Sequence, residues 1–246
     1  MAISVAQDLT ETFVTPSAEL IRRRDGGPVR LRRNGNRKTA MGILFSAKNG
    51  CHLPWDAKTE LKVCQWAEVS TDVVSYMTQP HTLRMVADGR QVTYTPDVRF
   101  DLAGGGVQVV EVKNRFDVRK DPAYSRKLKQ AAQVYAALGY TFTLVESADY
   151  EREPVFSAIT TLNRFKSTLV DQPASDTVID VLANGPAPLA RVLEVAPEGP
   201  RGIASLASMM VRRVISIEIE HGLVADAPVT LVRPNMVGTP LFVGRG

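Results

Sequence analysis

The segment YTPDVRFDLAGGGVQVVEVKNRFD, residues 94–117, decides the fold. Its second half, residues 107–113, carries apolar side chains at both odd and even positions, which is typical of a strand buried on both faces of a sheet. Three glycines at 104–106 precede that strand. They predict a hairpin turn rather than a phosphate-binding loop, because no helix follows them. We therefore expect a strand over 91–102 to pair with residues 107–113.

Charged side chains gather where the second strand ends. Glu111 and Lys113 are two residues apart, so both point to one face of the sheet, roughly 7 Å from each other. Whether Asp97 joins them depends on the register of the hairpin. In one register Leu102 pairs with Gly106, and Asp97 then lies directly opposite Glu111. A second register keeps the two carboxylates on one face along a diagonal, whereas a slip by one residue separates them.

Two carboxylates at one place repel each other unless a positive charge lies between them. A hard divalent cation with oxygen ligands suits this position, and magnesium keeps bound waters that a neighbouring lysine can orient or help to deprotonate. We expect Asp97 and Glu111 to bind the metal, with the backbone carbonyl of Val112 as a further oxygen ligand. The ammonium of Lys113 would offset the charge that develops on a phosphate under attack.

Glu60 is the fourth candidate residue of this site. A helix is expected from near Asp56, and on it Glu60 shares a face with the apolar residues three, four and seven positions further along. A carboxylate on such a stripe needs a partner, although a glutamate near a helix end can equally reach solvent. Glu68 is a rival, but it lies near the expected end of the helix, where exposure to solvent is easier.

Residues 51–150 are expected to form an α/β domain with a mixed sheet. An aspartate followed by a proline predicts the start of a second helix, because aspartate caps helices and proline fits their first turn. That helix lies between two strands, so these strands should run parallel to each other. The further expected elements are strands at 73–77, 82–86 and 141–146 and a helix from Asp121 to Gly139.

The pattern changes after residue 150. Residues 151–174 predict a polar connecting helix, at 153–170, and a linker around DQPASD. Residues 175–246 hold three short helical stretches and then two strands joined by a loop, the order of a small winged-helix-like domain. The third stretch, GIASLASMMVRR (202–213), is mostly small and apolar and has arginines only at its end. Because base reading favours Arg, Asn, Gln or Lys along a helix, this stretch fits a protein groove or its own core better than DNA.

Basic residues concentrate before the first expected helix. Residues 1–50 are expected to form a basic N-terminal arm, and between positions 21 and 50 nine basic side chains stand against one acidic side chain. Such a stretch is either a solvated surface segment or an arm that contacts DNA phosphates. The candidate DNA-binding residues are Arg22, Arg23, Arg24, Arg30, Arg32, Arg33, Arg37 and Lys38.

Composition excludes several classes of protein. With 246 residues, 44% hydrophobic and 23% charged, the chain has the composition of an ordinary soluble globular protein. No apolar run approaches the roughly 18 residues of a membrane span, and the N-terminus lacks a signal-peptide pattern. Two isolated cysteines fit neither a disulfide scaffold nor a zinc knuckle. We expect a cytoplasmic protein without a membrane partner.

Taken in order, Glu60, the TPD at 95–97 and the EVK at 111–113 resemble the PD-(D/E)xK nuclease superfamily. Together with DVVSYMTQP and KLKQAAQVYAALGYTFTLVE, they resemble more closely the TnsA-type endonucleases of heteromeric transposases, over residues 55–147. That family has a glutamate some 13 residues before the strand that corresponds to 73–77. Glu60 stands 13 residues before Val73, which favours it over Glu68.

The resemblance implies a restriction-endonuclease-like core that uses Mg²⁺, with Mn²⁺ able to substitute, to cut double-stranded DNA at the 5′ ends of a mobile element. It implies that Asp97, Glu111 and Glu60 form the metal site and that Lys113 positions the nucleophile. A transposase subunit that joins the 3′ ends and an ATPase regulator are the implied partners. The basic arm lies outside the resemblance.

Two other functions stay open. A free-standing PD-(D/E)xK endonuclease of a phage, restriction or repair system would carry its own DNA specificity. An inactive member, kept as a docking module for DNA or protein, is disfavoured by the complete set of four candidate residues. A neighbouring gene for an integrase-type transposase would favour the TnsA-like function over the free-standing one.

Overall fold

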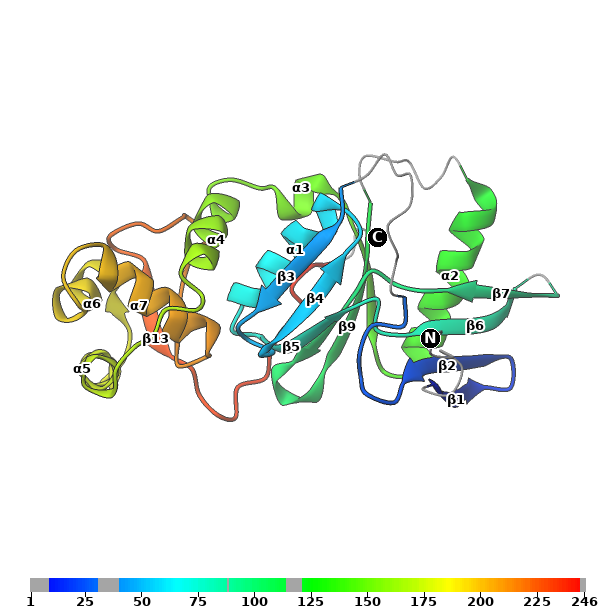
Figure 1. The fold of residues 1–246 in the computed structure, drawn as a ribbon, viewed down its shortest axis with the longest axis horizontal. Helices are drawn as coiled ribbons and strands as arrows, with labels where there is room; N and C mark the ends of the chain where they lie inside the picture. Colours follow the sequence, from blue (N-terminus) through cyan, green and yellow to red (C-terminus); the bar gives the residue numbers. More distant parts are fainter. Residues whose placement is uncertain (1–8, 31–39, 88, 114–120, 244–246) are drawn as a thin grey trace, which may run out of the picture.

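Residues 94–113 of the segment that decides the fold run through the centre of the molecule (Figure 1). The computed structural model describes residues 9–30, 40–87, 89–113 and 121–243. Strands β8 (Val98–Leu102) and β9 (Val107–Val112) form the expected antiparallel hairpin, joined by a 3-10 turn at Ala103–Gly105. Gly104 and Gly105 have φ of 80° and 92°, a region that favours glycine, which explains the glycine run.

The central sheet is mixed, as the sequence predicts. Its strand order is β10-β9-β8-β5, with β5 at Val73–Thr78 and β10 at Thr141–Val145. Strand β10 runs parallel to β9, and helix α2 (Pro122–Ala137) connects the two. The side chain of Asp121 caps this helix by accepting a hydrogen bond from the N–H of Tyr124 at 3.0 Å. The predicted strand–helix–strand unit is therefore confirmed.

The expected continuous strand over 91–102 is wrong. The chain forms β7 (Arg90–Tyr94), leaves it, and enters β8 in a different sheet. Pro96 lies in the break, and proline cannot donate a backbone hydrogen bond to a strand ladder. The second sheet is antiparallel with the order β1-β2-β6-β7, in which the other strands are β1 (Leu9–Thr15), β2 (Ala18–Arg23) and β6 (Thr82–Ala87).

Residues 9–30 and 40–50 do not form the expected extended arm. Strand β2 pairs with β6, and the side chains of Leu20 and Ile21 on it are buried. A second hairpin, β3 (Gly42–Ser46) with β4 (Cys51–Trp55), precedes the first helix. The three arginines directly after Ile21 led the sequence pattern to predict a charged arm here. Removing residues 1–50 would therefore open the core as well as delete charge.

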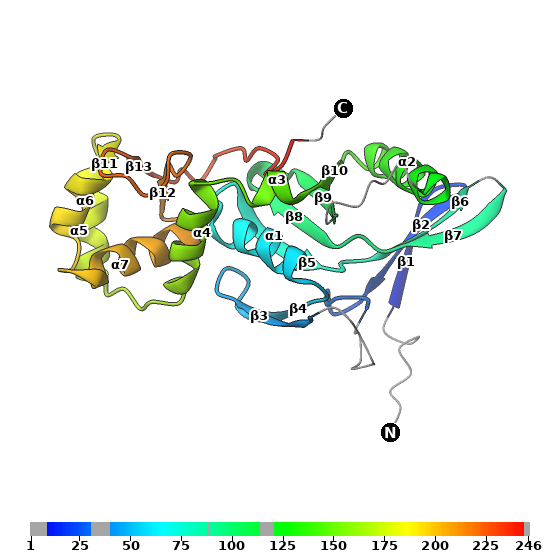
Figure 2. The same cartoon turned by 90° about the horizontal axis from the view of Figure 1, so that it is seen from above.

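Helices α1 and α2 lie on opposite sides of β9 (Figures 1 and 2). Helix α1 (Lys58–Val69) begins after Ala57 rather than after Asp56. Val110 of β9 belongs to a large core with α1, whereas Val109 belongs to a smaller core with α2. Apolar side chains on both faces of β9 are thus explained by a helix on each side. Glu111 shares the α2 face with Val109 because side chains alternate along a strand.

The elements from α4 to β13 form helices and a small sheet at one end of the molecule (Figure 1). The helix expected at 153–170 forms as α4 (Val155–Arg164), but it is shorter and not wholly polar, because it buries Val155, Ile159 and Leu162 and packs on α1. DQPASD is also not a linker, since Asp171 caps the start of α5. The remaining elements are α3 (Ser147–Tyr150), α5 (Gln172–Leu182), β11 (Ala187–Pro188), α6 (Leu189–Val195), α7 (Pro200–Val211), β12 (Ile215–Ile217) and β13 (Pro228–Leu231).

The chain after β13 returns to the central sheet. Phe242 is buried there against the rings of Trp66 and Phe100, at centroid distances of 5.6 and 6.3 Å. The fully buried amide of Gln108 on β9 donates to the carbonyl of Phe242 at 2.6 Å and accepts from the N–H of Leu241 at 2.7 Å. Leu241 and Phe242 are therefore attached to the predicted nuclease domain, with Phe242 in its core, although the sequence pattern assigned them to the C-terminal domain.

Across the described ranges, none of the helices combines the length and apolar character needed to cross a membrane. Both cysteines are free thiols, with Cys64 buried and Cys51 partly buried. The cytoplasmic location stays a prediction.

Candidate active site

The hairpin register brings two of the candidate carboxylates together. The N–H of Leu102 donates to the carbonyl of Gly106 at 2.8 Å, which is the first of the two expected registers. Continued by one residue beyond β8, this pairing puts Asp97 opposite Glu111. Oδ2 of Asp97 accepts a hydrogen bond from the backbone N–H of Val112 at 2.7 Å. The Asp97 side chain is thereby fixed against the end of β9.

Glu111 is buried, with 4% of its surface exposed, and three donors hold its carboxylate. Nζ of Lys113 lies 2.6 Å from Oε1, so the expected pair of charges on one strand face is confirmed. The hydroxyl of Tyr94 donates to Oε2 at 2.7 Å, and the hydroxyl of Tyr124 donates to Oε1. A buried carboxylate is stable in such a place only when donors of this kind surround it.

Sequence reasoning missed both tyrosines. Tyr94 ends β7 in the second sheet, so nothing local indicated that its hydroxyl reaches β9. Tyr124 stands in the first turn of α2, where its spacing matched the apolar face of the helix. The available signals were a tyrosine near a helix start and another tyrosine three residues before Asp97. Each tyrosine ring packs in the smaller core beside α2, while its hydroxyl donates a hydrogen bond to Glu111.

The surroundings of Asp97 are strongly negative. Burial raises the pKa of its carboxyl well above the usual range, and the negative charge of Glu111 raises this pKa further. The charge of Glu60 adds to the same effect. The N–H of Val112 and the ammonium of Lys113 act in the opposite direction but do not cancel it. Three carboxylates thus act on one another here, and a cation would relieve their repulsion.

Glu60 and Glu68 have different roles on α1. Glu68 is fully buried and accepts hydrogen bonds from the hydroxyls of Ser46 and Tyr76, at 2.7 and 2.6 Å, and from two backbone N–H groups of the β3–β4 turn. It is a structural residue of that turn. Glu60, 7% exposed, lies in the first turn of α1 and accepts a hydrogen bond from the N–H of Asp56, just before the helix, at 2.8 Å. Its charge contributes to the raised pKa of Asp97, and its place as the fourth member of the site stays a prediction.

Within the described residues, no three His, Cys, Asp or Glu side chains converge closely enough to hold a metal ion. The reason is visible at Glu111, whose oxygens face Tyr94, Tyr124 and Lys113. The donor chemistry nevertheless fits a hard divalent cation, because the set is made of carboxylates that repel each other. Binding would require Glu111 to exchange at least one of its donors for the cation. Val112 contacts Asp97 through its N–H; a role for its carbonyl as a ligand stays a prediction.

The candidate DNA-binding arginines fall into three groups. Arg22 and Arg23 belong to β2 and are partly buried, with the guanidinium of Arg22 donating to the Tyr140 hydroxyl at 3.4 Å and Arg23 paired with Asp25. Arg24 and Arg30 are exposed. Lys48, from the same basic stretch, donates to the carbonyls of Ser70 and Val73, and burial lowers its pKa to about 7. The residues outside the described ranges are Arg32, Arg33, Arg37 and Lys38.

No protein-family model matches the chain, and no curated protein matches its sequence. The inference of function therefore rests on the residues of the site and on their arrangement. The arrangement consists of Asp97 and Glu111 on neighbouring strands, Lys113 beside Glu111, and Glu60 at the start of α1.

Proposed function

We propose that this chain is a divalent-metal-dependent DNA endonuclease of the PD-(D/E)xK type. The observation that carries the proposal is the contact of the Asp97 carboxylate with the N–H of Val112, opposite Glu111 and beside Lys113. A mixed sheet with a helix on each side, and with the acidic site at the end of β9, supports a restriction-endonuclease-like core.

The residues of the site have distinct tasks in the proposed reaction, which is attack of water on a phosphodiester. A bound divalent cation would supply positive charge and make a coordinated water more acidic. Asp97 and Glu111 would hold that cation from two strands in fixed register. Lys113 would orient the attacking water and offset the charge that develops on the phosphate. Glu60 would complete the acidic set from α1.

We further propose a TnsA-like role, in which the chain cuts at the 5′ ends of a mobile element beside a transposase subunit, with an ATPase regulator. The unit formed by α5, β11, α6, α7, β12 and β13 has the element order of a winged helix, which supports a winged-helix-like domain. Helix α7, in the place of a recognition helix, is buried from Ala204 to Val211. The two arginines after it donate to backbone carbonyls, Arg212 to Thr168 at 3.2 Å and Arg213 to Thr71 at 2.9 Å. This favours specificity supplied by a partner.

The test of the nuclease activity is cleavage of supercoiled plasmid by the purified chain in Mg²⁺, in Mn²⁺ and in EDTA. The expected result is nicked or linear product with either metal and none in EDTA. The assay should also be run with the transposase encoded beside this gene, because a partner-dependent enzyme shows little activity alone. Absence of cleavage under every one of these conditions would favour an inactive docking module.

A further inference from the structure

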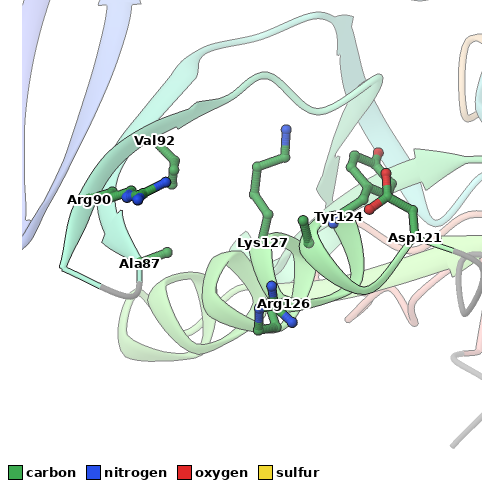
Figure 3. A pocket seen from close by; sticks show the side chains of 8 residues that line it. Ala87, Arg90, Val92, Asp121, Tyr124, Arg126 and Lys127 are labelled. Atoms are coloured by element: carbon green, nitrogen blue, oxygen red, sulfur yellow. Dashed lines mark hydrogen bonds between the residues drawn. The ribbon is translucent and has the colours of Figure 1, made fainter.

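A hollow with a volume of about 620 Å³ lies beside the candidate active site, between the start of β7 and the first half of α2 (Figure 3). The strand contributes one wall and the helix contributes the other. The residues that line it are Ala87, Arg90, Val92, Asp121, Ala123, Tyr124, Arg126 and Lys127. We call it the β7–α2 groove.

The β7–α2 groove is positively charged. Arg90 and Arg126 are exposed, Lys127 is half-buried, and Figure 3 shows Arg90 facing Lys127 across the hollow. Among the described residues that line the groove, Asp121 is the one acidic side chain, and its Oδ1 already accepts a hydrogen bond from the N–H of Tyr124. The lining apolar side chains are small. Cations spread along two walls, rather than converging on one point, suit an extended polyanion better than a small phosphate ester.

Tyr124 connects this groove to the acidic site. Nζ of Lys113 lies 4.6 Å from the centre of the Tyr124 ring, and Nζ of Lys127 lies 5.0 Å from it. Both ammonium groups therefore stand against one aromatic ring, which is a favourable cation–π arrangement. The hydroxyl of the same ring donates to Glu111. A phosphate bound by Lys127 would therefore lie close to the same Tyr124 ring that Lys113 contacts.

We propose that the β7–α2 groove binds the sugar–phosphate backbone of the duplex DNA that enters the active site, with Arg90, Arg126 and Lys127 as its phosphate contacts. This inference rests on the proposed nuclease function and adds the path of the substrate. It places the substrate contacts on β7 and α2, away from the arginine-rich stretch that the sequence singled out. Contacts of this kind hold the strand in position without reading its sequence.

The test is binding of a short fluorescent duplex of random sequence to the full-length chain in EDTA, measured by anisotropy over a range of salt concentrations. The variant is Arg90→Ala with Lys127→Ala. The matched control is Arg164→Ala with Arg191→Ala, which removes two exposed charges from α4 and α6, far from the groove.

For two lost phosphate contacts, the slope of log affinity against log salt should fall by about 1.8, and affinity at 0.1 M salt should fall on the order of 50-fold. The control should lose far less.

A groove variant that binds with the affinity and salt slope of the control would overturn the proposal. So would a wild-type chain that binds no duplex at all. The conservative pair Arg90→Lys with Lys127→Arg should retain most of the binding, which separates loss of charge from loss of folding. EDTA prevents metal-dependent cleavage during the binding measurement, and cleavage is measured separately in Mg²⁺ and in Mn²⁺ with the neighbouring transposase present. Groove-dependent DNA binding by a chain that fails to cut in that second assay would support the groove and refute the nuclease. Conversely, a wild-type chain that cuts DNA, together with a groove variant that binds DNA as tightly as the control, would support the nuclease and refute the groove.

Discussion

Nζ of Lys113 lies 2.6 Å from Oε1 of Glu111, two residues away on the same strand face. Glu111 has two further donors in Tyr94 and Tyr124, so Lys113 is one of three groups that hold this carboxylate. The Lys113 side chain is 21% exposed, whereas that of Glu111 is 5% exposed. Lys113 is thus the member of the pair that can reach a substrate without leaving a new cavity behind.

Replacing Lys113 with alanine should abolish cleavage and leave the fold intact. The ammonium acts on charge that develops during the reaction, so its loss should lower the rate on the order of 100-fold or more. The free energy of unfolding should change by about 1 kcal/mol or less, because Tyr94 and Tyr124 still hold Glu111. Plasmid cleavage and urea unfolding measure the two effects. Near-native cleavage by the folded variant would refute the assignment of the site.

Replacing Asp97 with asparagine should weaken Mg²⁺ binding and stabilise the metal-free protein. Asparagine can still accept the hydrogen bond from Val112, but it removes one of the mutually repelling carboxylates. Loss of a direct ligand should reduce metal affinity on the order of 10-fold or more, as measured by calorimetric titration. The melting temperature without metal should rise. Asp101→Asn, which changes a carboxylate paired with Arg99, is the control and should leave metal affinity unchanged. Equal affinities in both variants would make Asp97 a structural residue.

His81 should make the protein sensitive to acid. Burial lowers its pKa to about 3, and the positive charges of Arg22 and Arg99 contribute to the shift. Nε2 is bonded to the Tyr135 hydroxyl at 2.7 Å, and Nδ1 is buried without a partner among the described residues. The neutral ring is therefore favoured in the folded state. The unfolded chain takes up a proton near pH 6.5, so stability falls as the pH drops below that value.

Between pH 7.5 and pH 5 this single group should cost about 2 kcal/mol of stability. Urea unfolding of the wild type and of His81→Gln at both pH values measures the difference. The variant should be less stable at pH 7.5 but should lose about 2 kcal/mol less on acidification. The exposed His221→Gln variant should follow the wild type. Parallel losses in all three proteins would show that His81 does not titrate as inferred.

Phe242 should be a major contributor to stability despite its place near the end of the chain. Its buried ring packs on Trp66 and Phe100, and Gln108 fixes the backbone beside it. Phe242→Ala should cost about 3 kcal/mol, the usual scale for a large aromatic residue lost from a core. Val243→Ala, at an adjacent position that is 86% exposed, should have almost no effect. A Phe242→Ala protein as stable as the Val243→Ala protein would mean that the tail is not docked in solution.

Short-range patterns predicted the parts of the site that lie on one hairpin. Alternation along β9 and the glycine turn led to two expected registers that keep Asp97 and Glu111 on one face, and the structure adopts the first of them. The long-range parts carried no such signal. Nothing in the sequence near Tyr94 shows that its strand lies over β9, and nothing near Phe242 shows that the tail crosses back to β9. The burial of Leu20 and Ile21 was likewise not predicted, because three arginines follow directly at positions 22–24.

The last prediction is that the isolated chain cuts DNA poorly and without sequence preference. A sequence reader would have to present polar side chains to base edges, yet α7 faces α4 and α1 and is buried along most of its length. Arg212 and Arg213, the only basic residues at its end, are engaged with carbonyls of the same chain. The β7–α2 groove offers phosphate contacts, which position DNA without specifying it.

Specificity should therefore come from a partner that binds the ends of the element. The measurement is cleavage of a plasmid carrying those ends, compared with one lacking them, by the chain alone and with its neighbouring transposase. The expected result is weak, unspecific nicking by the chain alone and cutting at the ends when the transposase is present. The Lys113→Ala protein serves as the control, because it should assemble with the partner and still fail to cut. Efficient, site-specific cutting by the isolated chain would instead identify a free-standing endonuclease, whose DNA reader must then lie outside α7.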